Sequence, residues 1–127
     1  IGAGATLVTL SGTQTLTNKT LISPVTTMGT NARVASYTLV LSDQSKIIEI
    51  SNGSANTLTV PANATEAFPI GTYLLVIQTG AGQITITPAG GVTIDGTPGL
   101  KTRAQWSSVT LIKRATNTWV AMGDLVA

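Results

Sequence analysis

The chain has 127 residues, with seven Lys or Arg against five Asp or Glu, and it contains no cysteine and no histidine. The missing cysteines exclude disulfides and thiolate metal sites, and the missing histidines remove the commonest catalytic base and metal ligand. A net charge of +2, carried by only 9% charged residues, is too weak to indicate nucleic acid, and no apolar run reaches the roughly 18 residues of a membrane helix.

The first predicted element is an extended strand over residues 11–24. Threonines alternate there with other side chains, and a period of two with β-branched residues is typical of a strand. Lys19 is the only charge, and the apolar side chains, such as Leu16 and Leu21, are too few to form a core. Such a segment becomes ordered only by pairing with other backbone. We therefore predict a stalk over residues 1–33, in which Leu16 and Leu21 contact other chains.

From Tyr37 onward the strand pattern is nearly continuous, with turn residues every 8–12 positions and no helical period. These features predict an all-β fold of about eight short strands, an antiparallel β-sandwich or jelly roll that forms a knob over residues 34–127. The motifs TLTV, ITIT and VTLI look alike, but any threonine-rich strand would share their pattern, and we predict no repeat. The predicted strands cover residues 37–41, 48–50, 57–60, 73–77, 83–87, 92–94, 106–113 and 119–122.

Two of these elements carry more specific expectations. The run 73–77, YLLVI, is apolar on both faces, which indicates a central strand covered by the opposite sheet and by a neighbouring subunit. Tyr73, Leu75 and Ile77 are accordingly candidates for an interface between chains. The last two strands are predicted to form a hairpin around residues 115–117, and Phe68 is expected to be a buried plug in the loop 61–69.

The candidates for chemistry are few. The carboxylates are widely spaced, and although two could meet as a glycosidase pair, we expect solvated acids at turns and strand ends. No combination of residues indicates a nucleophile, a metal ligand set or a cofactor site, so the sequence predicts a protein that is not an enzyme. The five carboxylates are Asp43, Glu49, Glu66, Asp95 and Asp124.

The basic residues leave two alternatives open. Lys101 and Arg103 share one face by their spacing, and with Arg114 they could form a patch for an anionic surface or a solvated edge that prevents aggregation. Lys113 and Arg114 are consecutive in a strand and must point to opposite faces. One of them is therefore expected to point inward or toward a subunit boundary, where a carboxylate such as Glu49 or Asp124 could pair with it.

Trp106 and Trp119 also have two interpretations. Exposed aromatic rings stack on sugars, so a pair near loop ends could form a platform for a glycan. A tryptophan that flanks a hairpin in a small sandwich more often belongs to the core or to an interface. With 4% aromatic residues, the chain is poorly supplied for carbohydrate recognition.

The stretch QTLTNKTLISP, at residues 14–24, closely resembles a linker that recurs in fibre proteins of tailed bacteriophages. Three later stretches are similar to the terminal domain of phage tail-fibre and head-fibre proteins, and they follow in the same order. They are YTLVLSDQSKIIEI, SANTLTVPANATEAFPIGTYLLVIQTGAGQITI and GLKTRAQWSSVTLIKRATNTWVAMGDL.

This resemblance implies a virion structural protein that assembles as a homotrimer in the host cytoplasm and then lies on the particle surface. Its expected partners are copies of itself, other virion proteins on the N-terminal side, where a longer chain would continue before Ile1, and a glycan or protein of the host surface. Adhesion to a host and decoration of the capsid are both open, and a small lectin unrelated to phage is a third class. Neither nucleic acid nor membrane insertion is expected.

Overall fold

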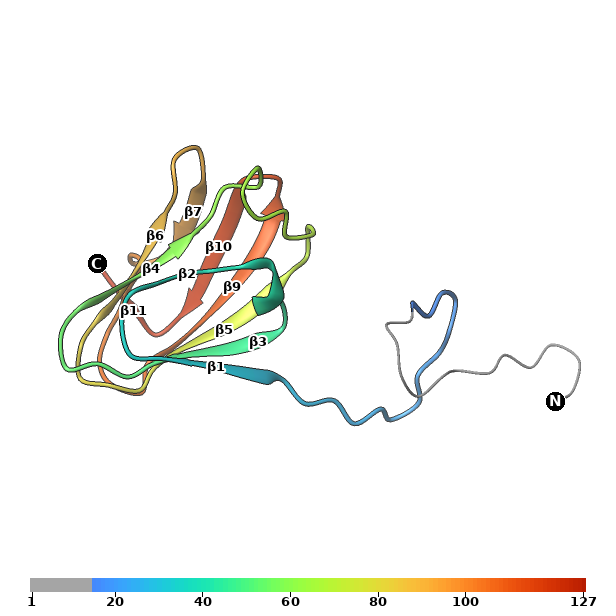
Figure 1. The fold of residues 1–127 in the computed structure, drawn as a ribbon, viewed down its shortest axis with the longest axis horizontal. Helices are drawn as coiled ribbons and strands as arrows, with labels where there is room; N and C mark the ends of the chain where they lie inside the picture. Colours follow the sequence, from blue (N-terminus) through green and yellow to red (C-terminus); the bar gives the residue numbers. More distant parts are fainter. Residues whose placement is uncertain (1–14) are drawn as a thin grey trace, which may run out of the picture.

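The computed structural model describes residues 15–127, which fold into two β-sheets (Figure 1). The predicted all-β class is confirmed, and the only helical turn among these residues is the short 3-10 helix η1 (Leu41–Asp43). In spatial order, one sheet contains β1 (Gly29–Arg33), β3 (Lys46–Ile50), β5 (Tyr73–Gln78), β9 (Ser108–Ala115), β10 (Thr118–Gly123) and β7 (Thr93–Gly96). The other contains β11 (Leu125–Val126), β8 (Lys101–Thr102), β6 (Ile84–Pro88), β4 (Asn56–Val60) and β2 (Tyr37–Thr38).

The first six strands form a coil rather than an antiparallel sandwich. They alternate between the sheets, so β1, β3 and β5 are parallel neighbours in one sheet and β2, β4 and β6 in the other. Ile48 pairs with Val76 and Leu58 with Ile86, the same sequence offset in both sheets. This solenoid-like stacking replaces the purely antiparallel pairing that the sequence predicted, because the alternation of side chains does not distinguish parallel from antiparallel neighbours.

The C-terminal part closes this coil with a hairpin. β9 and β10 pair antiparallel, as predicted, and β9 also pairs antiparallel with β5. The hairpin thereby lies between β5 and β7, and β7 pairs in parallel with β10. In the other sheet β8 and β11 add antiparallel strands beside β6.

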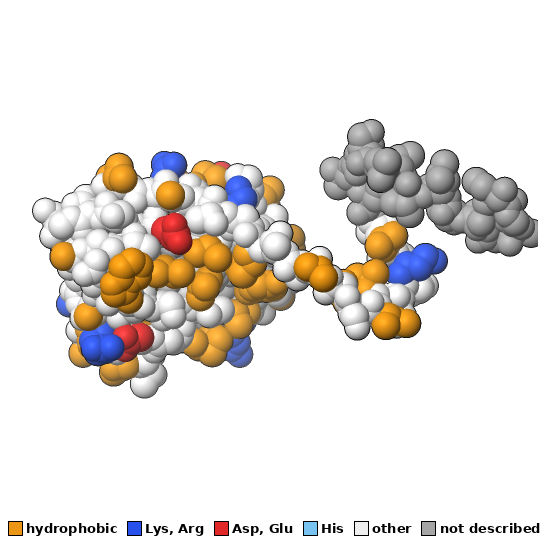
Figure 2. Space-filling model, turned by 90° about the horizontal axis from the view of Figure 1, so that it is seen from below, with side chains coloured by type: hydrophobic (Ala, Val, Ile, Leu, Met, Phe, Trp, Pro, Cys, Tyr) orange, Lys and Arg blue, Asp and Glu red, His pale blue; other side chains and the backbone are white. Residues whose placement is uncertain are grey.

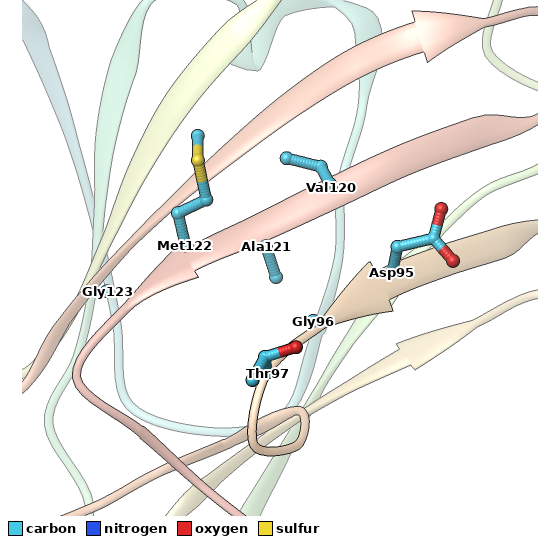
Figure 3. A pocket seen from close by; sticks show the side chains of 7 residues that line it. All are labelled: Asp95, Gly96, Thr97, Val120, Ala121, Met122 and Gly123. Atoms are coloured by element: carbon cyan, nitrogen blue, oxygen red, sulfur yellow. The ribbon is translucent and has the colours of Figure 1, made fainter.

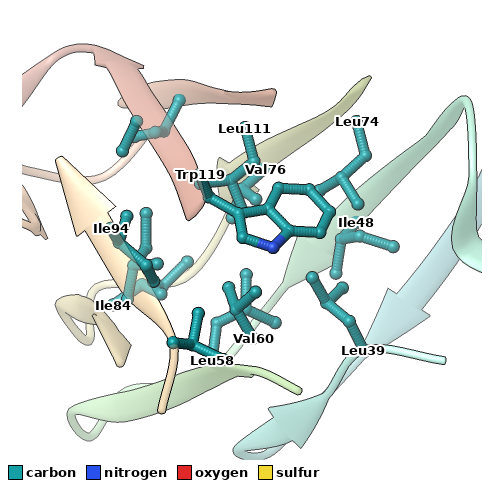
Figure 4. Close-up of a cluster of buried hydrophobic side chains, with 14 of the residues drawn as sticks. Leu39, Ile48, Leu58, Val60, Leu74, Val76, Ile84, Ile94, Leu111 and Trp119 are labelled. Carbon is teal, nitrogen blue, oxygen red and sulfur yellow. The ribbon is translucent and has the colours of Figure 1, made fainter. Parts of the chain in front are cut away.

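The core lies between the two sheets, where alternate side chains of each strand point inward (Figure 4). In β5 the inward residues Leu74 and Val76 are fully buried, and in β4 the inward residues are Leu58 and Val60. Phe68 is buried as predicted, and its ring meets Trp119 edge to face at a centroid distance of 5.5 Å. Trp119 lies between side chains from both sheets.

Residues 15–28 form an arm that leaves the domain at the start of β1 (Figure 1). The arm contains no strand, so the part of the predicted strand over 15–24 is not paired in the single chain, and residues 11–14 lie outside the described part. The first strand of the sheet, Gly29–Arg33, lies within the segment 1–33 that we assigned to the stalk. The β-domain therefore begins at Gly29.

Candidate functional site

The outer face of the six-stranded sheet is the broadest candidate surface. Tyr73, Leu75 and Ile77 point away from the core in β5, because they alternate with the buried side chains of that strand. Tyr73 lies opposite Ile112, and Leu75 lies opposite Ile47. Val120 and Met122 of β10 are further apolar members of this outer face. Polar residues lie among them, since Ile77 is between Glu49 and Ser108 and Leu75 is opposite Thr110.

These outer side chains remain partly exposed in the single chain. Tyr73 retains 49% of its accessible surface, whereas Leu75 and Ile77 are half-buried by their neighbours in the sheet. From below, on the side of the domain where β1 forms the edge of the sheet, a band of hydrophobic side chains also crosses the surface between a few charges (Figure 2). The structure thus brings the three predicted interface residues of β5 together with further apolar residues from β3, β9 and β10, which sequence spacing could not show.

A shallow hollow of about 300 Å³ lies at the β7 edge of this sheet (Figure 3). Val120 and Met122 point to one side of β10 and Ala121 to the other. The hollow is mostly apolar, with Asp95 on its rim. It extends the apolar outer face but contains no group arranged for catalysis.

The arm carries the second group of apolar side chains. Leu16 is 54% exposed and Leu21 is 62% exposed, so both predicted stalk contacts lack a covering surface in the single chain. Ile22 and Val25 are more exposed still. An apolar segment of this kind is stabilised when another chain covers it, because its apolar surface is removed from water.

The structure separates the two tryptophans. Trp119 is 1% exposed and belongs to the core, so it cannot take part in the predicted glycan platform. Trp106 is 69% exposed, in the loop between β8 and β9. Its backbone φ is +72°, in the left-handed region that a bulky side chain rarely adopts.

Lys101 and Arg103 lie on the same exposed side, on either side of buried Thr102, as their spacing predicted, whereas Arg114 is separate from them. Arg103 makes a two-pronged ion pair with Asp124, with both N···O distances at 2.8 Å. This pair raises the pKa of the Arg103 guanidinium, and the Arg103 and Ser107 hydrogen bonds lower the pKa of the Asp124 carboxyl. Arg114 lies at the far end of β9 from this loop, and Lys101 is exposed on β8.

Lys113 is the basic residue that points inward. It is 2% exposed, and its Nζ donates to Asn63 Oδ1 at 2.6 Å and to the Phe68 carbonyl at 2.7 Å. Its partners in the described chain are thus neutral, and neither Glu49 nor Asp124 reaches it. Burial lowers the pKa of Lys113, since the charged form loses its hydration.

Sequence reasoning missed the role of Asp43, which we expected to be solvated at a turn. Asp43 is fully buried, and its carboxylate accepts hydrogen bonds from Asn31 Nδ2, the Tyr37 hydroxyl and the Val40 amide at 2.9–3.0 Å. Burial, then the hydrogen bond to Asp43, raises the pKa of Tyr37. The cluster links β1, β2 and η1. Because the Asp43 carboxylate takes all these hydrogen bonds from its own domain, the cluster holds the first turn of the coil in place.

No group of three acidic residues that could hold a metal ion occurs within residues 15–127. Over the same residues, no helix is long and apolar enough to cross a membrane. A scan against protein-family models gives no match for this chain, and searches of curated proteins and of solved structures give none either.

Proposed function

We propose that this chain is a non-enzymatic structural protein of a phage virion, a trimeric fibre that displays its β-domain for attachment to a host surface. The observation that carries the proposal is the pair of uncovered apolar surfaces, on the arm and on the outer face of the six-stranded sheet. The resemblance of residues 14–24 to a phage fibre linker supports the same assignment.

The arm and the sheet face have complementary roles in this trimer. Leu16 and Leu21 of three chains pack against one another along the stalk, and Tyr73, Leu75 and Ile77 of three domains meet around the axis. Burial of apolar surface stabilises such contacts by about 25 cal/mol per Å² before the cost of association. A low density of charge on the chain favours this packing, since few ionised groups have to be desolvated.

Capsid decoration is the second candidate function. It is favoured by the arm, whose apolar side chains extend away from the domain and could bind a shell protein rather than other arms. In that case the chain would lie on the head of the particle, as a head fibre or cement protein that stabilises the shell. Imaging of labelled particles distinguishes the two, because a fibre tip and a capsid face are far apart.

The assembly is tested by the mass of the purified chain in solution. We expect sedimentation at micromolar concentration to give three times the 13.0 kDa of one chain. The double substitution Leu16→Asp and Leu21→Asp should dissociate the stalk, because it places charges in an apolar contact. The matched control, Thr17→Asp with Thr20→Asp, adds the same charge to the arm and should keep the mass of the trimer.

A monomeric wild-type chain would contradict the proposal directly. An unchanged mass after the two leucine substitutions would remove the stalk from the interface. In that outcome Leu75→Asp tests the sheet face alone. A trimer that survives both sets of substitutions would show that neither apolar surface holds the chains together.

A further inference from the structure

Trp106 is presented to solvent at an energetic cost. Residues other than glycine rarely adopt a positive φ, and a bulky side chain there is strained. Strain of this kind persists where the surrounding structure enforces it, and it is concentrated at binding and catalytic sites. The same residue exposes a large aromatic ring, which is 69% accessible, so the strained backbone and the exposed ring coincide at one position.

The loop that carries Trp106 is hydrogen-bonded to the end of β5. The Trp106 amide donates to the Gln78 carbonyl at 2.7 Å, and the Gln78 amide donates to the Ser107 carbonyl at 3.0 Å. The Gln78 side chain is buried, where it accepts a hydrogen bond from the Thr102 hydroxyl. Because both the backbone and the side chain of Gln78 are engaged, the loop has little freedom to withdraw the ring.

Further hydrogen bonds clamp the two sides of the loop. The Ser107 hydroxyl donates to Asp124 at 2.7 Å and accepts from the Ala104 amide at 3.0 Å. The Gln105 amide group donates to the Thr79 carbonyl at 2.9 Å. Asp124 in turn holds Arg103. The backbone of the loop is therefore held on several sides, and Arg103, the one cation within residues 103–107, is paired with Asp124.

The loop also lies at the end of the domain opposite to the arm. β9 begins at Ser108, which pairs with Ile77 near the C-terminal ends of β1, β3 and β5, whereas the arm enters at the N-terminal end of β1. In Figure 1 the arm leaves from the other end of the sheets. A fibre attached through its arm would point this loop outward.

We propose that Trp106 is a stacking platform for a neutral pyranose ring of a surface glycan. A pyranose has one face of C–H groups, which packs on an indole, and a rim of hydroxyls, which exchange hydrogen bonds with polar groups. Gln105 and the exposed Arg103–Asp124 pair supply such groups on the same loop. The proposal rests on the proposed function, since it names what the displayed domain would bind.

The surroundings of the ring favour a sugar over other partners. A bound phosphate or acidic peptide would need a cation without a carboxylate partner, and Arg103, the one cation within the loop 103–107, is engaged by Asp124. Lys101 precedes the loop on β8, and the anionic probes of the test cover a role for it. A stable protein interface buries roughly 1,000 Å² or more around a central anchor. The neighbours of Trp106 in the loop are Ala104, Gln105 and Ser107, which give no apolar rim of that kind.

The test is a titration followed by NMR of the two indole N–H resonances. The probes are the methyl glycosides of glucose, galactose, N-acetylglucosamine and rhamnose, with galacturonate and inorganic phosphate as anionic probes. We expect at least one neutral glycoside to shift the Trp106 resonance at millimolar concentration and to leave buried Trp119 unchanged. Because Trp106→Ala removes the reporting indole, its binding is followed by the backbone amide resonances of the loop 103–107, in the wild type as well, and it should weaken by about tenfold or more. Ile70→Ala, which removes a side chain that is 64% exposed, should leave binding unchanged.

Three outcomes would overturn the platform: no shift with any neutral glycoside, tighter binding of galacturonate or phosphate, or a lower assembly mass for Trp106→Ala. The last outcome would make Trp106 a contact between chains. The mass of the wild-type protein separates this inference from the proposed function. If the protein is a trimer that binds no sugar, the proposed fibre stands and the Trp106 platform is wrong. If it is a monomer that binds sugar, the proposed fibre is wrong and the platform stands.

Discussion

The two parts of the β-domain build the same pair of sheets in different ways. In residues 29–88 the chain passes from one sheet to the other after each strand, and the strands stack in parallel. In residues 93–126 β9 and β10 instead remain in one sheet and pair antiparallel. A coil leaves the last strand of each sheet with an unpaired edge. In the six-stranded sheet this strand is β5, and β9 of the hairpin covers its edge. The comparison shows that the C-terminal part completes a coil that would otherwise remain open.

The interiors of the two parts also differ. The coil contributes mainly branched aliphatic side chains, such as Leu58 and Ile86, whereas the hairpin contributes Trp119 and the buried amine of Lys113. Trp119 packs against Phe68 and lies 6.0 Å from the Lys113 Nζ. The largest side chain and the one buried cation of the described core therefore belong to the hairpin. Substituting one buried residue in each part, and measuring the free energy of unfolding, shows how much each interior contributes to stability.

The largest effect is expected at Trp119. Trp119→Ala should lower the free energy of unfolding by about 4–5 kcal/mol, because it opens a large cavity and removes the contact with Phe68. Leu58→Ala, at an equally buried position in the coil, should cost about 3 kcal/mol. Denaturant unfolding of both variants gives the comparison. A larger loss at Leu58 would show that the coil, and not the hairpin, dominates the stability of the domain.

The sequence predicted the strands better than their partners. Period-two alternation located the long strands from β3 onward, the terminal hairpin and the buried Phe68, because each of these depends on residues close in the chain, but it missed β1. Parallel pairing depends on residues far apart, and alternation is the same in both arrangements. TLTV and ITIT nonetheless mark β4 and β6, which are stacked neighbours. Their likeness had a structural basis that the sequence alone could not establish.

The candidate surfaces were predictable to different degrees. The outward face of β5 followed from its run of apolar residues, but its extension over Ile112 and Met122 required the pairing. The separation of the two tryptophans was not predictable, since Trp106 is presented by a left-handed backbone that no spacing rule indicates. The Asp43 cluster was missed for a similar reason, because its partners Asn31 and Tyr37 come from different strands.

A smaller effect is expected from Lys113, and it depends on pH. Lys113→Met should cost about 1–3 kcal/mol at neutral pH, since Asn63 Oδ1 and the Phe68 carbonyl lose their donor. Burial lowers the pKa of Lys113 below its ordinary value of 10.5, so between these two values the unfolded chain binds more protons than the folded chain. The wild-type free energy of unfolding should therefore rise with pH across this interval, relative to the variant.

Unfolding of both proteins at a series of alkaline pH values tests this dependence. Tyr37, whose pKa is raised above its ordinary value of 10.0, contributes equally to both proteins and cancels in the difference. A constant difference across the series would mean that the Lys113 amine keeps its ordinary proton affinity in the fold. In that outcome the interior of the hairpin would not differ from that of the coil by holding a desolvated amine.

The smallest effect is expected at the exposed Arg103–Asp124 pair, which lies where β9 begins and β10 ends, at the opposite end of the hairpin from its turn. The Arg103 and Ser107 hydrogen bonds lower the pKa of Asp124 below its ordinary value of 3.8. Its contribution is therefore present above 3.8 and is lost as the pH falls through the lower folded value. In an acid titration by NMR, Arg103→Ala should raise the midpoint for Asp124 and loosen the Trp106 loop, because the carboxylate loses its guanidinium partner. If the Asp124 midpoint does not move, the ion pair does not hold the loop, which then depends on its hydrogen bonds to Gln78 and Thr79 and is as independent of charge as the coil.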